Sequence, residues 1–299
     1  MIQSFFGSFI QIYYNLWRTL RLNPVTNAPR GLSVAYELHP VVLCIDVMSG
    51  AQCFSHKQHR VVPIHFLLAE LLWILSGSND AKMITSYNKS MIHFSDDGVT
   101  LYGAYGKRIY EQISICIDML CADPSTRRAV VSIYDSEDTG KDTKDVPCNV
   151  LLQFLIRNEC VNLYIISRSS DFVTGLSIDA VHWQILLMLV VNELNYCGQH
   201  VNCGYVYYTI HSLHVYTQDK DIVNAWEDIP NSTLEYMSES ETFKVGGRYR
   251  KVKTCAEEQF TNHLSLMELM HMLTIKEEHR QIMTKYSTLF LTHRNKINR

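Results

Sequence analysis

The sequence predicts an α+β domain in which a large mixed or antiparallel sheet packs against one long, buried central helix. Residues 180–194, "AVHWQILLMLVVNEL", form an apolar run that indicates a helix buried nearly all round. The segments on both sides of this run alternate in hydropathy or are rich in β-branched residues, as strands are. This order of elements favours a single domain over residues 1–299, in which residues 220–299 are a divergent helical portion.

In the N-terminal third, apolar residues with helical spacing predict an amphipathic first helix. They are Phe5, Phe9, Tyr13, Leu16 and Leu20. A Pro- and Asn-rich loop at 23–31 then leads into a predicted strand at 32–47, "LSVAYELHPVVLCIDV". Residues 63–77 predict a buried helix that ends at Gly77 and has Glu70 in its middle.

The central and C-terminal segments continue this mixture. A Gly-rich turn at 94–106 precedes a predicted helix, and a turn with two arginines at 123–128 precedes a predicted strand. Residues 146–171 alternate well enough for two antiparallel strands joined at "RNE", residues 157–159. After the buried helix, residues 204–219 predict one more strand, and the last 60 residues become polar and predict extra helices.

The composition excludes several classes of function. The formal net charge is −3 in 299 residues, so the chain has no global basic field, and we expect no nucleic-acid partner. The nine cysteines are an odd number without the spacing of a disulfide framework. This indicates reduced thiols in a cytoplasmic protein, acting in the host cell if a phage encodes it.

Two features argue against export and against a membrane. The N-terminus has no basic start, and Gln3, Gln11 and Asn15 interrupt its apolar residues, unlike those of a signal peptide. No segment reaches the roughly 18 uninterrupted apolar residues of a membrane span. We therefore expect no membrane partner.

Cys148 follows a proline at the start of a predicted strand, just after a polar loop. The ordinary interpretation of such a residue is a buried core cysteine. A nucleophilic role requires nearby positive charge, because the thiolate is the reactive form. Arg127, Arg128 and Arg168 each lie beside strand-like apolar sequence, and with Ser169 they have the chemistry of a bidentate phosphate clamp. Alternatively, the adjacent arginines are a solvated surface pair.

Six segments, taken together and in this order, resemble the thymidylate synthase family. They are "AELLWILSG" (69–77), "YGAYGKRI" (102–109), "DPSTRRAVVS" (123–132), "VPCNVLLQF" (146–154), "RSSDFVTGLSID" (168–179) and "HSLHVY" (211–216). The resemblance covers about residues 1–220 and implies the fold of that family. It also implies a homodimer that binds a pyrimidine nucleoside monophosphate, with 5,10-methylenetetrahydrofolate as the one-carbon donor and no metal.

The resemblance implies roles for individual residues. Cys148 matches the nucleophile that adds to C6 of the pyrimidine, and Glu70 matches the glutamate that organises water and protons over the base. The residues that match phosphate ligands are Arg168, Ser169 and Arg30, together with Arg127 and Arg128 from the other subunit. His214 and Tyr216 match the residues that bind the sugar 3′-hydroxyl. Tyr105 matches a tyrosine near the nucleophile, and Asp171 and Gly175 match positions near the folate.

Asp179 departs from the synthases, which have an asparagine there that pairs with N3–H and O4 of uracil. An ionised carboxylate only accepts hydrogen bonds, so it suits the 4-amino group of cytosine and a protonated N3. A site built for one donor pattern rejects the other by a factor of about 10⁴. With this aspartate the chain resembles the cytidylate (dCMP or CMP) 5-hydroxymethylase branch. The alternative interpretation makes Asp179 a first-turn acid of the helix, with Ser177 as the N-cap.

The implied reaction begins when the Cys148 thiolate adds to C6 of dCMP or CMP and C5 attacks the one-carbon unit of the folate. Tetrahydrofolate leaves, water positioned by Glu70 adds to the resulting exocyclic methylene, and Cys148 is expelled. "SMIHFSDDG" (90–98) lacks the tryptophans that keep water from this intermediate in synthases. The ending "LTHRNKINR" also differs from the short apolar tail that closes over folate in synthases.

Three alternatives remain at this point. The chain is a thymidylate synthase or a dUMP hydroxymethylase with the same fold, or it is a catalytically idle paralogue that binds nucleotide or RNA. The third alternative is a metal site at Cys197, His200 and Cys203, in what reads as a helix-to-strand connection.

Overall fold

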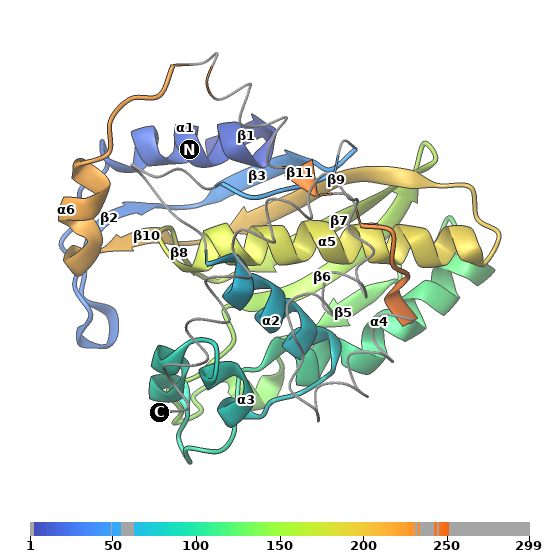
Figure 1. Cartoon of the computed structure of the whole chain (residues 1–299), viewed down its shortest axis with the longest axis horizontal. Helices are drawn as coiled ribbons and strands as arrows, with labels where there is room; N and C mark the ends of the chain where they lie inside the picture. Colours follow the sequence, from blue (N-terminus) through green and yellow to red (C-terminus); the bar gives the residue numbers. More distant parts are fainter. Residues whose placement is uncertain are drawn as a thin grey trace.

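The computed structural model describes residues 3–48, 50–54, 63–230, 233, 242–243 and 245–250. Its main sheet has six strands in the order β1-β3-β9-β7-β6-β5 (Figure 1). In that order the strands span Gln3–Gly7, Val41–Asp46, Asn202–Ile210, Cys160–Ser167, Asn149–Arg157 and Val130–Ser132. β1 pairs with β3 and β7 pairs with β9 in parallel, whereas the other neighbours are antiparallel. The predicted mixed sheet of an α+β fold is confirmed.

The predicted central helix is α5, Gly175–Tyr196, which packs on β7 and β9. Every residue from 180 to 191 is buried, so this part of the helix has no solvent-facing side. By length and composition α5 is apolar enough to cross a membrane, but 83% of its most apolar window is buried inside the domain. Its apolar character therefore has a sufficient cause in the core of the protein.

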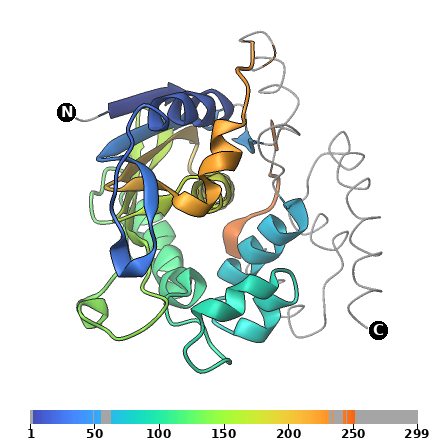
Figure 2. The ribbon, with the colours of Figure 1, turned by 90° about the vertical axis from the view of Figure 1, so that its left-hand side faces the viewer.

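The other helices surround α5. α1 (Phe9–Leu20) packs on β1 and β3, α4 (Tyr105–Ala122) packs on β5, and α2 (Ile64–Leu75) packs against α4 and α5. Figure 2 shows α5 end-on, with α2 on the same side of the main sheet and farther from it. Two short helices, α3 (Ala81–Thr85) and α6 (Lys220–Asn224), lie at the periphery.

Smaller sheets complete the described fold. A three-stranded sheet has the order β2-β10-β8, with strands Val34–Leu38, Leu213–Tyr216 and Ser170–Asp171. Because β8 and β10 run parallel with His214 opposite Asp171, the segment after β7 and the segment after β9 meet beside the start of α5. The third sheet pairs β4 (Ala51–Gln52) with β11 (Thr242–Phe243).

The predicted N-terminal helix begins later than its apolar spacing indicated. Phe5 lies in β1, which ends at Gly7 with φ of 132°. Ser8 and Gln11 then form a capping box that defines the start of the helix at Phe9. The inclusion of Phe5 in the helix was therefore wrong, because the cap overrides the spacing.

Two segments that we predicted as single strands each form two. Within 32–47, the cis peptide bond between His39 and Pro40 separates β2 from β3. Within 204–219, the chain leaves the main sheet after β9 and enters the three-stranded sheet as β10, with His211 and Ser212 between the two strands. In both segments the predicted strand is divided because its two halves pair with different strands, which the hydropathy pattern does not reveal.

Other local predictions are confirmed. β6 and β7 form the predicted antiparallel hairpin, and Asn158 and Glu159 at its turn have φ values of 51° and 59°. The helix at 63–77 ends as predicted, with Gly77 at φ of 70°. The residues for which we predicted extra C-terminal helices lie mostly outside the described residues, and the single-domain boundary stays a prediction.

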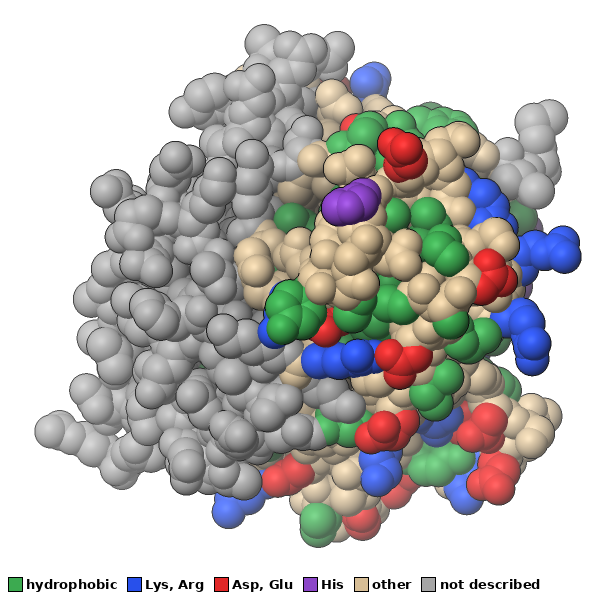
Figure 3. Space-filling model, turned by 90° about the vertical axis from the view of Figure 1, so that its right-hand side faces the viewer, with side chains coloured by type: hydrophobic (Ala, Val, Ile, Leu, Met, Phe, Trp, Pro, Cys, Tyr) green, Lys and Arg blue, Asp and Glu red, His purple; other side chains and the backbone are tan. Residues whose placement is uncertain are grey.

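Acidic and basic side chains are mixed on the face shown in Figure 3. Over the described atoms there, Lys and Arg alternate with Asp and Glu rather than gathering by sign. This agrees with the small net charge of −3.

Candidate functional site

Cys148 lies immediately before β6, and the end of β7 holds it in place. The Arg168 backbone N–H donates to the Cys148 carbonyl at 2.9 Å, and the Ser167 hydroxyl donates to the same oxygen at 3.0 Å. Arg168 Nη2 lies 3.6 Å from Cys148 Sγ, and Ser169 Oγ lies 3.7 Å from it. The structure therefore brings together the sequence-predicted nucleophile and two of the predicted phosphate ligands.

The Arg168 guanidinium also fastens the chain in front of Cys148. Nε donates to the Pro147 carbonyl at 2.9 Å, and Nη2 donates to the Val146 carbonyl at 2.8 Å. Nη1 donates to Ser169 Oγ at 3.2 Å. Because a guanidinium has five N–H donors in a fixed fork, Arg168 can hold this loop and still direct an N–H toward an anion.

Opposing charges surround the Cys148 thiol. Burial raises its pKa above the ordinary value, whereas the positive charge of Arg168 and the Ser169 hydroxyl lower it. The Asp179 carboxylate raises the pKa and Arg30 lowers it. Since the balance is upward, the thiol at rest is mostly protonated at neutral pH, and its reactivity depends on Arg168.

The loop before Cys148 is anchored to the turn that precedes α4. Asp145 accepts a hydrogen bond from the Gly103 backbone at 2.8 Å, and a Cβ added at Gly103 would lie 2.4 Å from the Asp145 carbonyl. Farther back, Arg108 forms a bidentate ion pair with the buried Asp138 at 2.7 and 2.9 Å. These contacts set the position of Tyr105, at the start of α4, relative to Cys148.

Asp179 is enclosed by groups from three elements. The Asn149 side chain donates from Nδ2 to Asp179 Oδ2 at 3.1 Å, and the Tyr208 hydroxyl lies 3.5 Å from the same oxygen. Tyr208 also donates to Asn149 Oδ1 at 2.9 Å. Burial raises the pKa of Asp179 to about 6, while the hydrogen bonds from Asn149 and Tyr208 lower it. At neutral pH the carboxylate is therefore mostly ionised.

Asn149 and Tyr208 were not among the residues predicted from the sequence. A signal for the first was available, since Asn149 is a polar residue directly after the predicted nucleophile and before the apolar residues 150–152. Tyr208 lies on the buried face of β9, where its neighbours on the same face, Val206 and Ile210, are apolar. A buried polar group of this kind requires a partner.

The helix-cap interpretation of Asp179 is wrong. α5 begins at Gly175 with Thr174 at the N-cap, so Ser177 lies inside the helix and Asp179 in its second turn. The turn before α5 is held by Asp171, whose carboxylate accepts from the Val173 N–H at 3.1 Å and from the Thr174 N–H at 2.8 Å. Because Asp171 satisfies the N–H groups there, the helix starts earlier than Ser177.

Glu70 and Tyr105 complete the buried end of the site. Burial, with a smaller contribution from the Asp179 carboxylate, raises the pKa of Glu70 to about 8. Burial also raises the pKa of Tyr105 well above its ordinary value, with Asp179 and Cys148 acting in the same direction. At neutral pH the site thus combines a protonated carboxyl, Glu70, with an ionised one, Asp179, which is the separation that acid and base roles require.

His182 sets the distance between the helices that carry these two carboxyls. It lies three residues after Asp179 on α5, and its Nε2 lies 2.8 Å from the Leu67 carbonyl, three residues before Glu70 on α2. Burial lowers the pKa of His182 to about 4, so its imidazole is neutral and its Nε2–H donates to that carbonyl.

The predicted sugar-binding residues lie on β10. His214 is buried, its Nε2 has no hydrogen-bond partner among the described residues, and its ring contacts that of Tyr216 at 4.7 Å. Burial raises the pKa of Tyr216 and Asp171 adds to this, whereas Arg30 and Arg168 lower it. An unpartnered buried nitrogen next to a phenol suits a hydroxyl ligand.

The other predicted residues lie farther out. Arg30 is exposed in the 3₁₀ turn Pro29–Gly31 and has φ of 55°, and Asp171 is engaged in its own turn. A Cβ at Gly175 would meet its nearest atoms at ordinary distances of 3.5 and 3.8 Å, so packing does not require glycine there. Arg127 and Arg128 are exposed before β5 and are not brought to Cys148 of the same chain.

The metal alternative is not supported. Among the described residues, no three His, Cys, Asp or Glu side chains gather as metal ligands, so Cys197, His200 and Cys203 do not form such a group. Cys197 and His200 lie in the connection between α5 and β9, as the sequence indicated, whereas Cys203 lies in β9.

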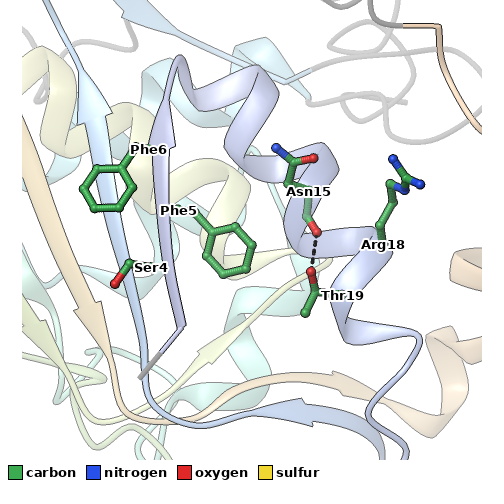
Figure 4. Close-up of a pocket in the computed structure, with 6 residues that line it drawn as sticks. All are labelled: Ser4, Phe5, Phe6, Asn15, Arg18 and Thr19. Atoms are coloured by element: carbon green, nitrogen blue, oxygen red, sulfur yellow. Dashed lines mark hydrogen bonds between the residues drawn. The ribbon is translucent and has the colours of Figure 1, made fainter. Parts of the chain in front are cut away.

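A separate cavity of about 410 Å³ lies between β1 and α1 (Figure 4). It is lined by Ser4, Phe5, Phe6, Asn15, Arg18 and Thr19, none of which belongs to the Cys148 site. The one hydrogen bond drawn there, from Thr19 to the Asn15 carbonyl, is internal to α1. Titratable groups with opposed pKa shifts gather around Cys148 instead, and we therefore assign the chemistry to that site.

The chain is similar in sequence to several known proteins. The sequence pattern of the family described as thymidylate synthase matches residues 46–234. A deoxyuridylate hydroxymethyltransferase of Bacillus phage SP01 is 32% identical over 70% of this chain and 57% of its own length. One of Pseudomonas phage M6 is 35% identical over 40% of this chain and 37% of its own. A thymidylate synthase of Buchnera aphidicola is 28% identical over 44% of this chain and 54% of its own length. The matched part of the chain thus spans 37% to 57% of the length of these relatives.

Proposed function

The chain belongs to the thymidylate synthase family, and from this premise we propose that it is a one-carbon transferase that hydroxymethylates C5 of a cytidine monophosphate, dCMP or CMP. The one-carbon donor is 5,10-methylenetetrahydrofolate and the second reactant is water. The product is a 5-hydroxymethylcytidylate.

The observation that carries the choice of base is the ionised carboxylate of Asp179, which lies near Cys148 and acts on its pKa. Its Oδ2 is occupied by Asn149 and Tyr208, and no hydrogen bond from the described residues reaches Oδ1. An unoccupied carboxylate oxygen accepts a hydrogen bond from the 4-amino group of cytosine, whereas it repels O4 of uracil. The cost of an unpaired buried polar group then discriminates between the two bases.

The residues around the base divide the chemistry among them. Arg168 lowers the pKa of Cys148 and favours the thiolate that adds to C6. Asp179 favours protonation of N3, which makes C6 more electrophilic toward the thiolate. The addition of the thiolate at C6 then makes C5 nucleophilic toward the one-carbon unit. Glu70, protonated at neutral pH, holds the water that adds to the exocyclic methylene, and expulsion of Cys148 restores the ring.

The folate is a co-substrate that supplies the one-carbon unit and leaves as tetrahydrofolate. Asp171 and Gly175, at the start of α5, are our proposed contacts with it. The Asp171 carboxylate already accepts two backbone N–H groups, which fix its orientation and leave further lone pairs for a ring N–H. Gly175 is half-buried and has no side chain that would block the folate at the start of α5.

We further propose that the protein is a homodimer. The face of the main sheet opposite α5 presents half-exposed tyrosines, of which Tyr164 and Tyr207 stack at 4.7 Å, and Val130 at its edge is 43% exposed. An apolar face of this kind suits a second copy of the chain. Arg127 and Arg128, next to Val130, have no side-chain hydrogen bond or ion pair to the described residues, and we propose that they reach the phosphate site of the partner.

A second candidate is hydroxymethylation of dUMP. Two observations favour it: the phage relatives are named deoxyuridylate hydroxymethyltransferases, and the pKa of Asp179 is raised to about 6. A protonated Asp179 donates a hydrogen bond and suits O4 of uracil. The two candidates therefore differ in the protonation of one carboxyl at the working pH.

The test incubates the purified protein with methylenetetrahydrofolate and, separately, with dCMP, CMP and dUMP. Product masses identify the base and the sugar, and absorbance identifies any dihydrofolate. We expect 5-hydroxymethylcytidylate without dihydrofolate, and no product from the Cys148→Ala variant. A methylated uridylate with dihydrofolate would instead identify a synthase, and nucleotide binding without any product would identify an idle paralogue.

A further inference from the structure

Asp179 Oδ2 is one end of a three-residue hydrogen-bonded chain that starts on β9. The Tyr208 hydroxyl donates to Asn149 Oδ1 at 2.9 Å, and Asn149 Nδ2 donates to Asp179 Oδ2 at 3.1 Å. Tyr208 and Asn149 are both completely buried, and neither has a role in the reaction described above. We call these three residues the Tyr208–Asn149–Asp179 relay.

The relay determines which way the Asn149 amide points. A phenol has one hydrogen, and the acceptor at 2.9 Å, Asn149 Oδ1, is closer than Asp179 Oδ2 at 3.5 Å. With its oxygen engaged by Tyr208, the Asn149 amide must turn its NH₂ group toward Asp179. The carboxylate oxygen nearest Asn149 therefore always meets a donor.

We propose that Tyr208 and Asn149 are positioning residues that determine which hydrogen-bonding pattern the side chain at position 179 presents to the pyrimidine. This inference rests on the proposed function, because it assumes that Asp179 reads the base. The donor on Oδ2 leaves Oδ1 as the acceptor for the cytosine amino group, and it also favours the charged carboxylate. In agreement with this, both residues lower the pKa of Asp179 against the effect of burial.

The relay predicts how Asp179→Asn changes the preference for the base. The NH₂ of Asn149 can pair only with an acceptor, so the amide oxygen of the substituted side chain must face Asn149 and its NH₂ must face the base. That NH₂ suits O4 of uracil and opposes the amino group of cytosine. The substitution alone is therefore expected to reverse the preference from dCMP to dUMP, because Tyr208 and Asn149 prevent the amide from turning over.

The test measures equilibrium binding of dCMP and dUMP, without folate, from pH 5.5 to 8.5. The variants are Tyr208→Phe, Asn149→Leu, Asp179→Asn and Asp179→Asn/Tyr208→Phe. The control is Tyr196→Phe, which removes a phenol hydroxyl at the exposed end of α5. Circular dichroism and thermal unfolding establish that each variant folds, and Asn149→Leu provides a second removal of the relay if Tyr208→Phe does not fold.

We expect Tyr208→Phe and Asn149→Leu each to lower the preference for dCMP about five- to tenfold. The loss of dCMP binding at low pH should move to higher pH, because Asp179 loses a donor to its charged form, and a purely structural role would not move it. The preference of Asp179→Asn for dUMP should fall about five- to tenfold when Tyr208→Phe is added.

Two outcomes would overturn the inference in distinguishable ways. A wild-type protein that fails to prefer dCMP would refute the proposed substrate and, with it, the acceptor role of Oδ1. A wild-type protein that prefers dCMP, with relay variants that keep both the preference and the pH profile of the control, would refute the relay alone.

Discussion

Replacing Arg168 with methionine tests the electrostatic basis of the proposed nucleophile. Arg168 Nη2 lies 3.6 Å from Cys148 Sγ, and Arg168 is the largest influence that lowers the pKa of this buried thiol. Methionine keeps much of the side-chain volume but removes the charge. We therefore expect Arg168→Met to raise the pKa of Cys148 further.

The expected shift follows from the distance. Two unit charges 3.6 Å apart attract by about 4–5 kcal/mol at an effective dielectric constant of 20, which corresponds to about three pKa units. This is an upper bound, because water that enters the vacated space solvates the thiolate. We expect a rise of between about one and three units, and a smaller one in Arg168→Lys, which keeps the charge but loses the planar fork.

The assay follows alkylation of Cys148 by iodoacetamide as a function of pH. Mass spectrometry of the Cys148 peptide separates this thiol from the other eight cysteines, and no substrate is needed. The control is Arg157→Met, an exposed arginine at the other end of β6. An Arg168→Met variant that folds and alkylates Cys148 with the wild-type pH profile would refute the electrostatic role of Arg168.

Three other changes test the supports of the site, each by chemical or thermal unfolding. His182→Gln keeps a donor for the Leu67 carbonyl. The pKa of His182 is about 4 in the folded protein, below its ordinary value of about 6.5, so protons bind the unfolded state more readily. The contribution of the neutral His182 to the free energy of unfolding is therefore complete above pH 6.5 and is lost as the pH falls toward 4. The variant should avoid up to about 3 kcal/mol of that loss. If wild type and variant lose the same free energy of unfolding between pH 7 and pH 4.5, this explanation is wrong. Asp138→Asn leaves the Arg108 charge without its buried partner and should cost about 3 kcal/mol in urea unfolding, whereas a cost below about 1 kcal/mol would show that the ion pair contributes little. Glu159→Gly relieves a turn residue at φ of 59° and should raise the melting temperature by about 1–2 °C, so a lower melting temperature would count against backbone strain there.

Local sequence patterns correctly predicted those helices and strands that pairing with distant strands does not divide. The run at 180–194 predicted α5 because burial on all sides leaves no polar position, and the turn at Asn158 and Glu159 separates two alternating strands. Periodicity failed at 32–47 and 204–219, where a cis His39–Pro40 bond and a change of sheet divide the runs. Those divisions depend on partner strands far away in the sequence.

The site shows the same limit. Motif order placed Cys148, Arg168 and Ser169 together, and the structure brings them within 3.7 Å. Asn149 and Tyr208 could not be linked to Asp179 in advance, since the three residues lie on β6, β9 and α5 and meet only when α5 packs on the sheet.

The sequence by itself determined the fold class and the family, because apolar periodicity and motif order are properties of the linear chain. It also predicted Asp179 as the residue that faces the base. Only the tertiary structure decided that Asp179 lies inside the helix rather than at its cap, and that Asn149, oriented by Tyr208, donates to one of its oxygens. Burial and charge separation depend on which distant elements surround a group. The opposed protonation of Glu70 and Asp179 therefore exists only in the folded chain.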